Sequence, residues 1–480
     1  MKLSEILKNV NILSATADLD TEIREICYDS RLVGEGDLFV AIKGFESDGH
    51  RFISKAIEQG AAAVLCQDIP DNCGIYVQTD DCRRALAMAS REFFDNPASE
   101  MVMIGITGTS GKTTVSHLIK HMLEQELGAK VGLIGTNGIM IGDELTHSER
   151  TTPESFELQM LFRRMADEGC THIVMEVSSH SLILDRVAGI HYNIAVYTNL
   201  SQDHLDFHGS MEEYAKAKSL LFDRCDMGVF NIDDDHVDIM MAGKNCKSLC
   251  YSAQGAGTEL RAENINLSAA GVSFDAVYGG ENTKCSLAIP GIFSVDNALA
   301  VIGTGLSLGM SLQQCAHALS NAKGVKGRLE VIPTGRDYSV IIDYSHKPDA
   351  LEKVLKTLKP VTEGRLVCLF GCGGDRDRLK RPIMGKIAAE NADFVIITSD
   401  NPRTEEPNAI IAEIVSGLRG SSTPHKVISS REDAIYWALD NARPGDVILL
   451  AGKGHEDYQI IGHEKRHMDE RELVAGHLKK

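Results

Sequence analysis

The sequence contains no apolar run that approaches the roughly 18 residues needed to span a membrane. Its first residues, MKLSEILKNVNILSATADLD, include Glu5 and Lys8 and therefore lack the uninterrupted apolar stretch of a signal peptide. Positive charge is scarce as well, since 49 Lys and Arg residues stand against 68 Asp and Glu residues without a local basic patch. The resulting formal charge of −19 repels nucleic acid and anionic lipid. We therefore expect a cytoplasmic protein with neither a nucleic-acid nor a membrane partner.

Paired cysteine spacing is also missing. The 12 cysteines are dispersed over 480 residues without a CxxC pair, which argues against a disulfide framework and for reduced thiols. Cys368 and Cys372 adjoin a glycine-rich turn without His partners, so we do not expect a metal site there. No apolar interface stripe is evident, and we expect a monomer.

The chain is too long for one ordinary core, and we expect three α/β domains. Short strand-like pieces such as 36–44 and 62–67 predict a small N-terminal α/β domain over 1–97. Strands alternating with helices then predict a central parallel-sheet domain with a phosphate loop (P-loop) over 98–327, with antiparallel strands at 257–289. The segment 323–332 is expected to be a glycine-bearing connector. Renewed alternation beyond it predicts a Rossmann-like C-terminal domain over 328–480.

The segment GITGTSGKTT (105–114) has the pattern of a strand that runs through glycines into a helix. Backbone N–H groups and the helix N-terminus can then surround phosphate oxygens, while Lys112 supplies a cation and Thr113 a hydroxyl for Mg²⁺. The strict pattern requires Gly at position 106, where this chain has Ile106. The loop is therefore a variant, and a glycine-rich turn without a ligand is the alternative.

Acidic and histidine side chains follow two later strands. Glu176 closes an apolar strand, where a carboxylate would lie beside a bound metal ion, although an exposed glutamate is the alternative. The run 198–222 carries four polar side chains that suit a ligand-facing loop better than a solvated surface: Asp203, His204, Asp206 and His208. Lys216 and Lys218 follow on a predicted helix, and their spacing alone does not choose between them.

In the last domain, the segments 371–382 and 399–407 both follow apolar strands, at the sheet edge where ligands bind. Arg376 and Arg403 can each pair with a carboxylate, while Asp400 and Glu456 can receive an ammonium group. Together they predict a pocket for a zwitterionic amino acid. The alternative for the Asn-Pro pair is a plain turn.

Eight of these segments, in order, resemble the motif set of the Mur ligases. They are GITGTSGKTT (105–114), EVSSHSLILDRV (176–187), TNLSQDHLDFHG (198–209), KGRLE (326–330), DYSHKPDALE (343–352), GCGGDRDRLKRP (371–382), DNPR (400–403) and AGKGHEDYQ (451–459). The resemblance covers nearly the whole chain. It implies a uridine-binding first domain, a central ATPase domain and an amino-acid-binding last domain.

The resemblance also implies a role for each matching residue. ATP would be held by Thr107, Gly108, Thr109, Ser110, Gly111, Lys112, Thr113, Thr114, Asn297, Arg328, Asp343 and His346. Catalysis would involve Lys112, Glu176, His204 and Lys218, with Thr113, Glu176, His204 and a carbamylated Lys218 as Mg²⁺ ligands. The nucleotide-sugar dipeptide would contact Ser30, Thr151, Thr152, Ser178 and Arg186. Diaminopimelate would contact Arg376, Asp400, Asn401, Pro402, Arg403, Gly452 and Glu456.

The implied reaction adds meso-diaminopimelate to UDP-N-acetylmuramoyl-L-alanyl-D-glutamate, in peptidoglycan precursor synthesis. ATP would first convert the D-glutamyl carboxylate into an acyl phosphate, which the diaminopimelate amine then attacks. Arg403 would select diaminopimelate over lysine, because lysine leaves its guanidinium unpaired. The alternatives are a lysine-adding ligase of the same family, a folate-polyglutamating ligase and an ATP-driven binding switch.

Overall fold

The structure, a computed structural model, describes residues 1–44, 47–69, 74–255 and 257–479. Residues 45–46, 70–73 and 480 therefore lie outside the described parts of the expected first and last domains. The chain divides into two units, Met1–Tyr251 and Ser252–Lys480. Among the described residues, no helix is both long and apolar enough to cross a membrane. The expected α/β fold with parallel sheets is confirmed, whereas the three domain boundaries stay predictions.

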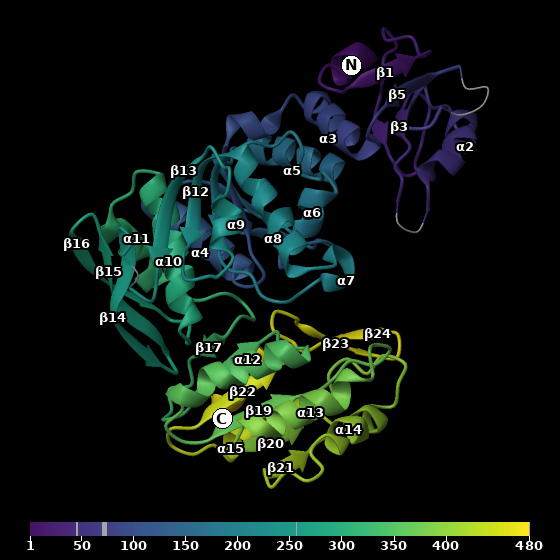
Figure 1. The fold of residues 1–480 in the computed structure, drawn as a ribbon. Helices are drawn as coiled ribbons and strands as arrows, with labels where there is room; N and C mark the ends of the chain where they lie inside the picture. Colours follow the sequence, from purple (N-terminus) through teal and green to yellow (C-terminus); the bar gives the residue numbers. More distant parts are fainter. Residues whose placement is uncertain (45–46, 70–73, 256, 480) are drawn as a thin grey trace. The chain divides into compact units, whose positions relative to one another are not determined.

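The first unit begins with a five-stranded sheet in the order β1-β5-β4-β3-β2 (Figure 1). Its strands are β1 (Ile12–Ala15), β2 (Ile26–Cys27), β3 (Leu38–Val40), β4 (Ala63–Cys66) and β5 (Tyr76–Thr79). β1 pairs antiparallel and the others pair in parallel. Alternate residues of β3 enter different cores: Leu38 and Val40 join the α1 (Leu3–Ile6) and α3 (Cys82–Phe93) side, and Phe39 joins the α2 (Ile53–Glu58) side. Helices therefore cover both faces.

The second sheet of this unit has the order β13-β12-β11-β6-β10-β7-β8-β9. Its parallel strands are β6 (Val102–Thr107), β7 (Val131–Gly135), β10 (His172–Glu176), β11 (Tyr192–Tyr197), β12 (Cys225–Asn231) and β13 (Lys247–Ser252), and β8 (Gly138–Ile141) and β9 (Glu144–Thr146) add antiparallel to β7. β6 lies at the centre between β10 and β11. Its carboxyl end is therefore at a switch in strand order, where open parallel sheets bind ligands.

Six helices accompany this sheet: α4 (Lys112–Leu127), α5 (Ser155–Asp167), α6 (Ser179–Ile183), α7 (Leu205–His208), α8 (Met211–Ser219) and α9 (Val237–Met241). α4 packs against β6, β7 and β10. Buried side chains of α5, α6 and α8, among them Phe162, Leu182 and Tyr214, share one core with the strands. The predicted alternation of strands and helices is confirmed here, whereas the antiparallel strands β8 and β9 were not predicted.

The second unit starts with the antiparallel strands β14 (Leu260–Ser268), β15 (Gly271–Tyr278) and β16 (Glu281–Leu287). The helices α10 (Phe293–Ser307) and α11 (Leu312–Asn321) pack against them. The prediction of a connector over 323–332 is wrong at its end, because Glu330–Ile332 form strand β17, which pairs antiparallel with β18 (Ser339–Asp343). The flanking Gly327 and Pro333 hid this three-residue strand from the sequence pattern.

The following sheet has the order β17-β18-β22-β19-β20-β21 and is parallel apart from β17. Its other strands are β18 (Ser339–Asp343), β19 (Leu366–Phe370), β20 (Phe394–Ile397), β21 (His425–Val427) and β22 (Val447–Ala451). In Figure 1, α12 (Pro348–Leu358), α13 (Lys380–Asn391) and α14 (Pro407–Ser416) lie side by side over the sheet. Side chains of α15 (Arg431–Asp440) and α16 (Glu470–Leu478) share a core with its strands. The hairpin β23 (Tyr458–Ile461) and β24 (Glu464–His467) follows β22.

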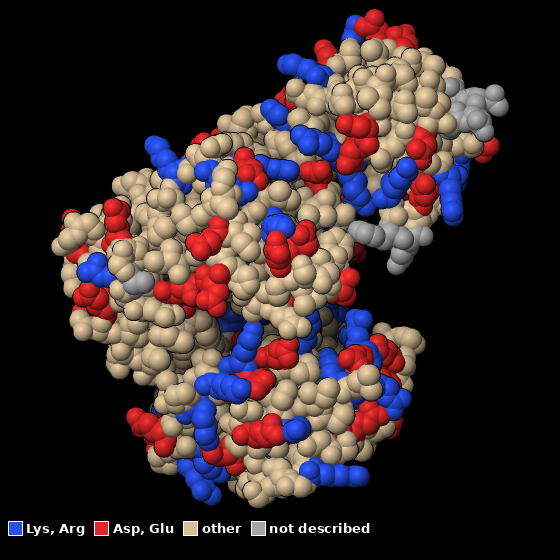
Figure 2. Space-filling model, viewed as in Figure 1, with Lys and Arg blue, Asp and Glu red and all other residues tan. Residues whose placement is uncertain are grey.

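Charged side chains are mixed over the surface. On the face drawn in Figure 2, Lys and Arg side chains lie interspersed with Asp and Glu side chains on both units.

Candidate nucleotide and amino-acid sites

The phosphate loop connects β6, which ends at Thr107, to α4, which begins at Lys112. Gly108 has a φ of +147°, and a Cβ atom there would lie 2.0 Å from Thr198 Oγ1. Only glycine fits this position, because any side chain would collide with the end of β11. Ile106 is a buried residue within β6, so the glycine-rich turn begins only at Gly108. The substitution in the strict pattern thus falls in the strand and leaves the turn intact.

The residues after β11 hold this loop in place. Thr198 Oγ1 donates to Ser110 O at 2.7 Å, and Ser110 N donates to Asn199 Oδ1 at 3.0 Å. Lys112 Nζ donates to the carbonyls of Gly108 and Thr109 at 2.8 and 3.0 Å. The expected lysine therefore lies across the turn, directly over its backbone.

Lys218 of α8 reaches the same loop. Its side chain is almost fully buried, and Nζ donates to Gly108 O at 2.9 Å and lies 4.5 Å from the centre of the Tyr214 ring. Burial, together with the nearby Lys112 charge, holds the pKa of Lys218 well below its ordinary value. Lys216 is exposed and pairs with Glu212 and Glu213. The structure thus separates two lysines that the sequence could not.

Glu176 ends β10 and is buried, which excludes the exposed alternative. Its two carboxylate oxygens accept from Thr136, one from the backbone N–H at 2.9 Å and one from the hydroxyl at 3.0 Å. The same threonine hydroxyl lies 3.0 Å from Thr151 Oγ1. Thr152 Oγ1 donates to the Glu176 carbonyl at 2.8 Å, and Arg186 Nη1 donates to Thr152 O at 3.2 Å. Five of the expected site residues, including Ser178 at 3.4 Å from Thr152, therefore meet at the carboxyl end of β10.

The histidines after β11 form a cluster with aromatic rings. His204 has a left-handed φ of 52°, and its ring centre lies 4.9 Å from that of His180. His208 contacts the Ser179 hydroxyl at 2.9 Å, and burial lowers its pKa to about 4. In the described parts of the chain, no three His, Cys, Asp or Glu side chains are grouped to hold a metal ion. A cation held by Glu176 or His204 would therefore need further oxygen ligands from threonine hydroxyls, a phosphate or a modified lysine.

Ser30, the expected uridine contact, is nearly buried just after β2. Two residues earlier, the Tyr28 hydroxyl donates a hydrogen bond to Glu157 Oε1 of α5 at 2.5 Å. This bond ties the first sheet's loop to the helix that follows Thr151 and Thr152.

Four expected nucleotide residues belong to the second unit. Asn297 is buried on α10. Asp343 ends β18 and accepts from the N–H groups of Leu329 and Ser345 at 2.8 and 2.9 Å. The Arg328 guanidinium lies 5.2 Å from the Tyr344 ring centre, and the imidazole of His346 contacts the Tyr344 carbonyl at 2.9 Å. Asp343, Arg328 and His346 therefore surround one turn at the carboxyl end of β18.

The residues expected to form the amino-acid pocket lie at the carboxyl ends of β19, β20 and β22. Arg403 has a left-handed φ of 51°, and Nη1 donates to Gly374 O at 2.8 Å. Two hydrogen bonds to the hairpin of β23 hold this uncommon backbone conformation. Arg403 N donates to Ile460 O at 3.1 Å, and Gly462 N donates to Arg403 O at 2.7 Å. Arg376 is exposed on the neighbouring loop. The loop carrying Arg403 is thus pinned on both sides of Pro402.

A buried arginine, missed from the sequence, connects the two pocket loops. Arg381 of α13 is fully buried and forms a bidentate pair with Glu405 at 2.7 and 2.9 Å. It also pairs with Glu413 of α14 at 2.8 Å and donates to Gly373 O at 3.2 Å. Arg381 holds the pKa of Glu405 at about 2, below its ordinary value of 4.5. The guanidinium therefore fixes residues next to both Arg376 and Arg403.

Lys453 is the second residue that sequence reasoning missed. It lies between Gly452 and Gly454 just after β22, and its ammonium contacts Asn401 Oδ1 at 3.1 Å and Glu456 Oε2 at 3.2 Å. Asp400 and Glu456 were expected to receive a ligand's ammonium group, but Glu456 already contacts one from the chain itself. The signal available was a lysine enclosed by glycines three residues before Glu456.

Comparisons with known proteins agree along the whole chain. "Mur ligase family, catalytic domain" matches residues 22–92, "Mur ligase middle domain" 106–305 and "Mur ligase, glutamate ligase domain" 327–454. The UDP-N-acetylmuramoyl-L-alanyl-D-glutamate--2,6-diaminopimelate ligase 1 of Clostridium acetobutylicum is 44% identical over 100% of this chain and 99% of its own. The corresponding ligase of Caldanaerobacter subterraneus subsp. tengcongensis is 47% identical over 99% of this chain and 98% of its own.

A solved structure of a UDP-N-acetylmuramoyl-L-alanyl-D-glutamate--2,6-diaminopimelate ligase has a TM-score of 0.77 and 32% identity, covering 100% of this chain and 99% of its own. The family resemblance drawn from the eight motifs is thereby confirmed. Full-length similarity to named ligases, joined to a glycine-cradled phosphate loop, leads to one conclusion: the chain is an enzyme and belongs to the Mur ligase family of ATP-dependent ligases.

Proposed function

We propose that the chain adds meso-diaminopimelate to the D-glutamyl residue of UDP-N-acetylmuramoyl-L-alanyl-D-glutamate, with conversion of ATP to ADP and phosphate. The observation that carries this proposal is 44% identity over the full length with a ligase named for that reaction. The three domains would be those expected from the sequence: 1–97 for the uridine end, 98–327 for ATP and 328–480 for the amino acid.

The phosphate loop would hold the ATP phosphates. Two features of the chain fit a phosphate ligand: a backbone cradle at Gly108 that a Cβ atom would fill, and the start of α4 at Lys112. Thr107 Oγ1 is also buried without a hydrogen-bond partner in the described part of the chain. The Lys112 ammonium would leave the carbonyls of Gly108 and Thr109 for phosphate oxygens, where it offsets charge that develops during transfer. Asn297, Arg328, Asp343 and His346 stay the predicted nucleotide contacts of the second unit.

The first chemical step would transfer the γ-phosphoryl group of ATP to the D-glutamyl side-chain carboxylate. A carboxylate is a poor electrophile, and the resulting acyl phosphate gives the attacking amine a good leaving group. The amine nitrogen of diaminopimelate then forms the amide bond, phosphate leaves with the C–O electron pair, and the nitrogen loses a proton. Thr151, Thr152, Ser178 and Arg186, gathered beside Glu176, would hold the dipeptide, and Ser30 the uridine.

Lys218 has the properties needed for carbamylation. Only a neutral amine adds to CO₂, releasing one proton as the carbamate forms, and the lowered pKa of Lys218 favours its neutral form. The product is a carboxylate-like group, which the Lys112 cation would attract. Thr113, Glu176 and the carbamate offer oxygen donors of the type that Mg²⁺ prefers, and His204 would add a nitrogen donor. When bound, Mg²⁺ would supply charge stabilisation for the transferring phosphoryl group.

The pocket at the carboxyl ends of β19, β20 and β22 would hold diaminopimelate. Arg403 and Arg376 would pair with the carboxylate that lysine lacks, while Asp400, Asn401 and Glu456 would face the distal ammonium group. Pro402 and Gly452 shape the pocket, since a Cβ atom on Gly452 would lie 3.0 Å from Asp400 Oδ2. A lysine-adding ligase of the same family is the alternative.

The test is incubation of the chain with ATP, Mg²⁺, the nucleotide-sugar dipeptide and each candidate amino acid in turn, followed by mass analysis of the product. The proposal expects a product enlarged by one diaminopimelate residue and little product with lysine. Product formed with lysine at a comparable rate would overturn the assignment to diaminopimelate.

A further inference from the structure

The side chain of Lys453 carries a fully buried ammonium group among the residues of the proposed amino-acid site. Burying a charge is costly unless partners replace the lost water. The described partners are Asn401 Oδ1 at 3.1 Å, Glu456 Oε2 at 3.2 Å and Asp400 Oδ1 at 3.9 Å. These are three of the residues proposed to contact diaminopimelate. A single ammonium therefore touches side chains from two separate loops of the pocket.

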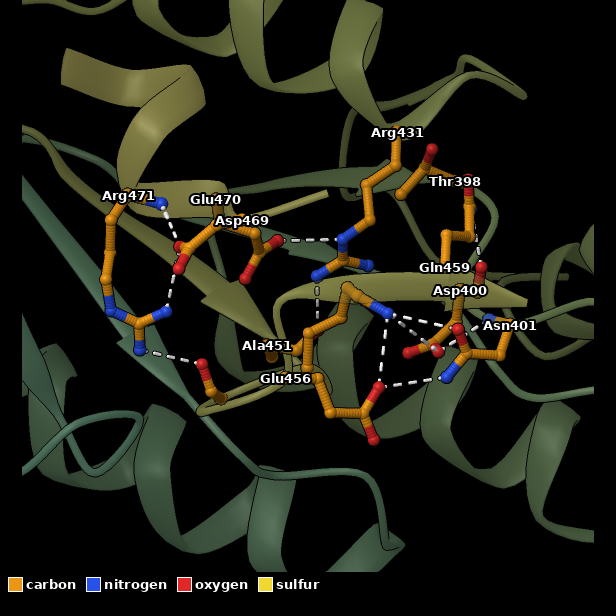
Figure 3. Close-up of polar contacts among 12 residues, drawn as sticks. Thr398, Asp400, Asn401, Arg431, Ala451, Glu456, Gln459, Asp469, Glu470 and Arg471 are labelled. Atoms are coloured by element: carbon orange, nitrogen blue, oxygen red, sulfur yellow. Dashed lines mark hydrogen bonds and ion pairs between the residues drawn. The ribbon is translucent and has the colours of Figure 1, made fainter. Parts of the chain in front are cut away.

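Lys453 orients the Asn401 amide. Because Asn401 Oδ1 accepts from both Lys453 and the N–H of Ile460 at 3.0 Å, the amide nitrogen must point the other way. That nitrogen donates to Glu456 Oε2 at 2.9 Å. Two donors thus hold one oxygen of Glu456, and the other oxygen points away from them in Figure 3. The free oxygen is the one that can accept from an incoming ligand.

A second buried ion pair supports the backbone just before Lys453. Arg431 and Glu470, at the starts of α15 and α16, are both fully buried, and Arg431 Nε lies 2.8 Å from Glu470 Oε1. Arg431 Nη2 also donates to the carbonyl of Ala451 at 2.9 Å (Figure 3). Gly452 N donates to Asp343 O at 3.0 Å. These two hydrogen bonds hold the backbone just before Lys453, so its ammonium has a defined position.

The charges of Asp400, Glu456 and Lys453 can be balanced by one more cation. Asp400 and Glu456 contribute two negative charges and Lys453 one positive charge, which leaves one net negative charge if all three are ionised. Without Lys453, Glu456 would lose one of the two donors that hold its Oε2 atom.

We propose that Lys453 is a positioning residue of the amino-acid site, which orients Asn401 and Glu456 and leaves a single negative charge for the ligand's distal ammonium group. This inference rests on the proposed function. It predicts a defect in amino-acid binding that depends on Glu456, with the nucleotide and dipeptide sites unaffected.

The experiment compares steady-state kinetics of wild type, Lys453→Met, Glu456→Gln and the double variant. We expect Lys453→Met to raise the KM for diaminopimelate by about ten- to a hundredfold, with the KM values for ATP and the dipeptide within about twofold of wild type. In the Glu456→Gln background the same change should have little further effect, because Lys453 acts largely through that carboxylate. The control is Lys465→Met, an exposed lysine over the Tyr458 ring in the neighbouring hairpin, which should behave as wild type.

Three results would overturn the inference: an unchanged KM for diaminopimelate in Lys453→Met, equal rises in all three KM values, or fully additive effects in the double variant. If Lys453→Met does not fold, Lys453→Gln keeps hydrogen-bond donors without the charge and gives the same readout. A wild-type protein that does not use diaminopimelate at all would instead refute the proposed function, so the two failures are distinct.

Discussion

The Nζ atom of Lys218 lies 2.9 Å from the carbonyl oxygen of Gly108, so a side chain of α8 rests on the loop between β6 and α4. The same carbonyl accepts from Lys112 at 2.8 Å. Two ammonium groups on one oxygen repel each other, and burial adds to this by penalising the charged form of Lys218. Burial and the neighbouring Lys112 charge therefore hold the pKa of Lys218 well below its ordinary value, at the loop that we propose to bind phosphate.

Replacing Lys218 with arginine should abolish the ligase reaction while leaving the fold intact. Arginine keeps the positive charge but cannot form a carbamate, so we expect activity to fall by about a hundredfold or more. With ¹³C-labelled bicarbonate, wild type should show a carbamate carbon signal by NMR that the variant lacks. Lys216→Arg, on the exposed face of the same helix, is the control and should retain both. Full activity of Lys218→Arg would contradict the carbamate role.

Gly108→Ala should disrupt ATP binding and lower stability. The new Cβ atom would lie 2.0 Å from Thr198 Oγ1 on a backbone with φ of +147°, so the loop must shift. We expect a loss of about 1–3 kcal/mol in the free energy of unfolding and a large rise in the Kd for ATP. Calorimetry and ATP titration measure the two effects. Gly476→Ala on α16, where a Cβ meets nothing within 4 Å, should leave ATP binding unchanged and should not lower stability, because alanine is favoured over glycine within a helix. Unaltered ATP binding by Gly108→Ala would argue against the phosphate-loop assignment.

Arg403→Ala should narrow the preference for diaminopimelate over lysine. The guanidinium is the candidate partner for the distal carboxylate, and losing it should cut kcat/KM for diaminopimelate by on the order of a thousandfold. Parallel kinetics with both amino acids would measure the change. Arg378→Ala removes a neighbouring exposed arginine that pairs with Glu413 and serves as the control. If Arg403→Ala left the kinetics of both amino acids unchanged, the selectivity account would fail.

The sequence predicted the fold well where local patterns decide it, and its motifs named candidate site residues whose roles stay predictions. Spacing alone could not choose between Lys216 and Lys218, and only the family resemblance indicated Lys218. Residues two apart on a helix lie on nearly opposite faces, but tertiary packing decides which face is buried. It also missed Arg381 and Lys453. Their partners lie 24 and 52 residues away in Glu405 and Asn401, and no local periodicity predicts such a pair.

The ion pair between Arg381 and Glu405 should make the stability of the fold depend on pH in the acid range. The pKa of Glu405 is about 2 in the folded chain and ordinarily 4.5, so the folded state favours its ionised form. The stability that this ion pair contributes is therefore present above about pH 4.5 and lost as pH falls toward 2. Thermal unfolding across this range should show a shallower pH dependence for Glu405→Gln than for wild type.

The control for this acid dependence is Glu390→Gln, which alters an exposed glutamate 3.7 Å from Lys386. It should show the same dependence of thermal unfolding on pH as wild type. Equal slopes for all three proteins would mean that the pair does not couple folding to the protonation of Glu405.

The central claim, that ATP use is tied to joining an amino acid to a nucleotide-sugar dipeptide, is tested most directly by phosphate release. The measurement compares phosphate formed from ATP with both acceptors present, with each acceptor alone and with neither. The account predicts sustained release only when diaminopimelate and UDP-N-acetylmuramoyl-L-alanyl-D-glutamate are both present. Equal ATP turnover without either acceptor would contradict it and favour an ATP-driven switch.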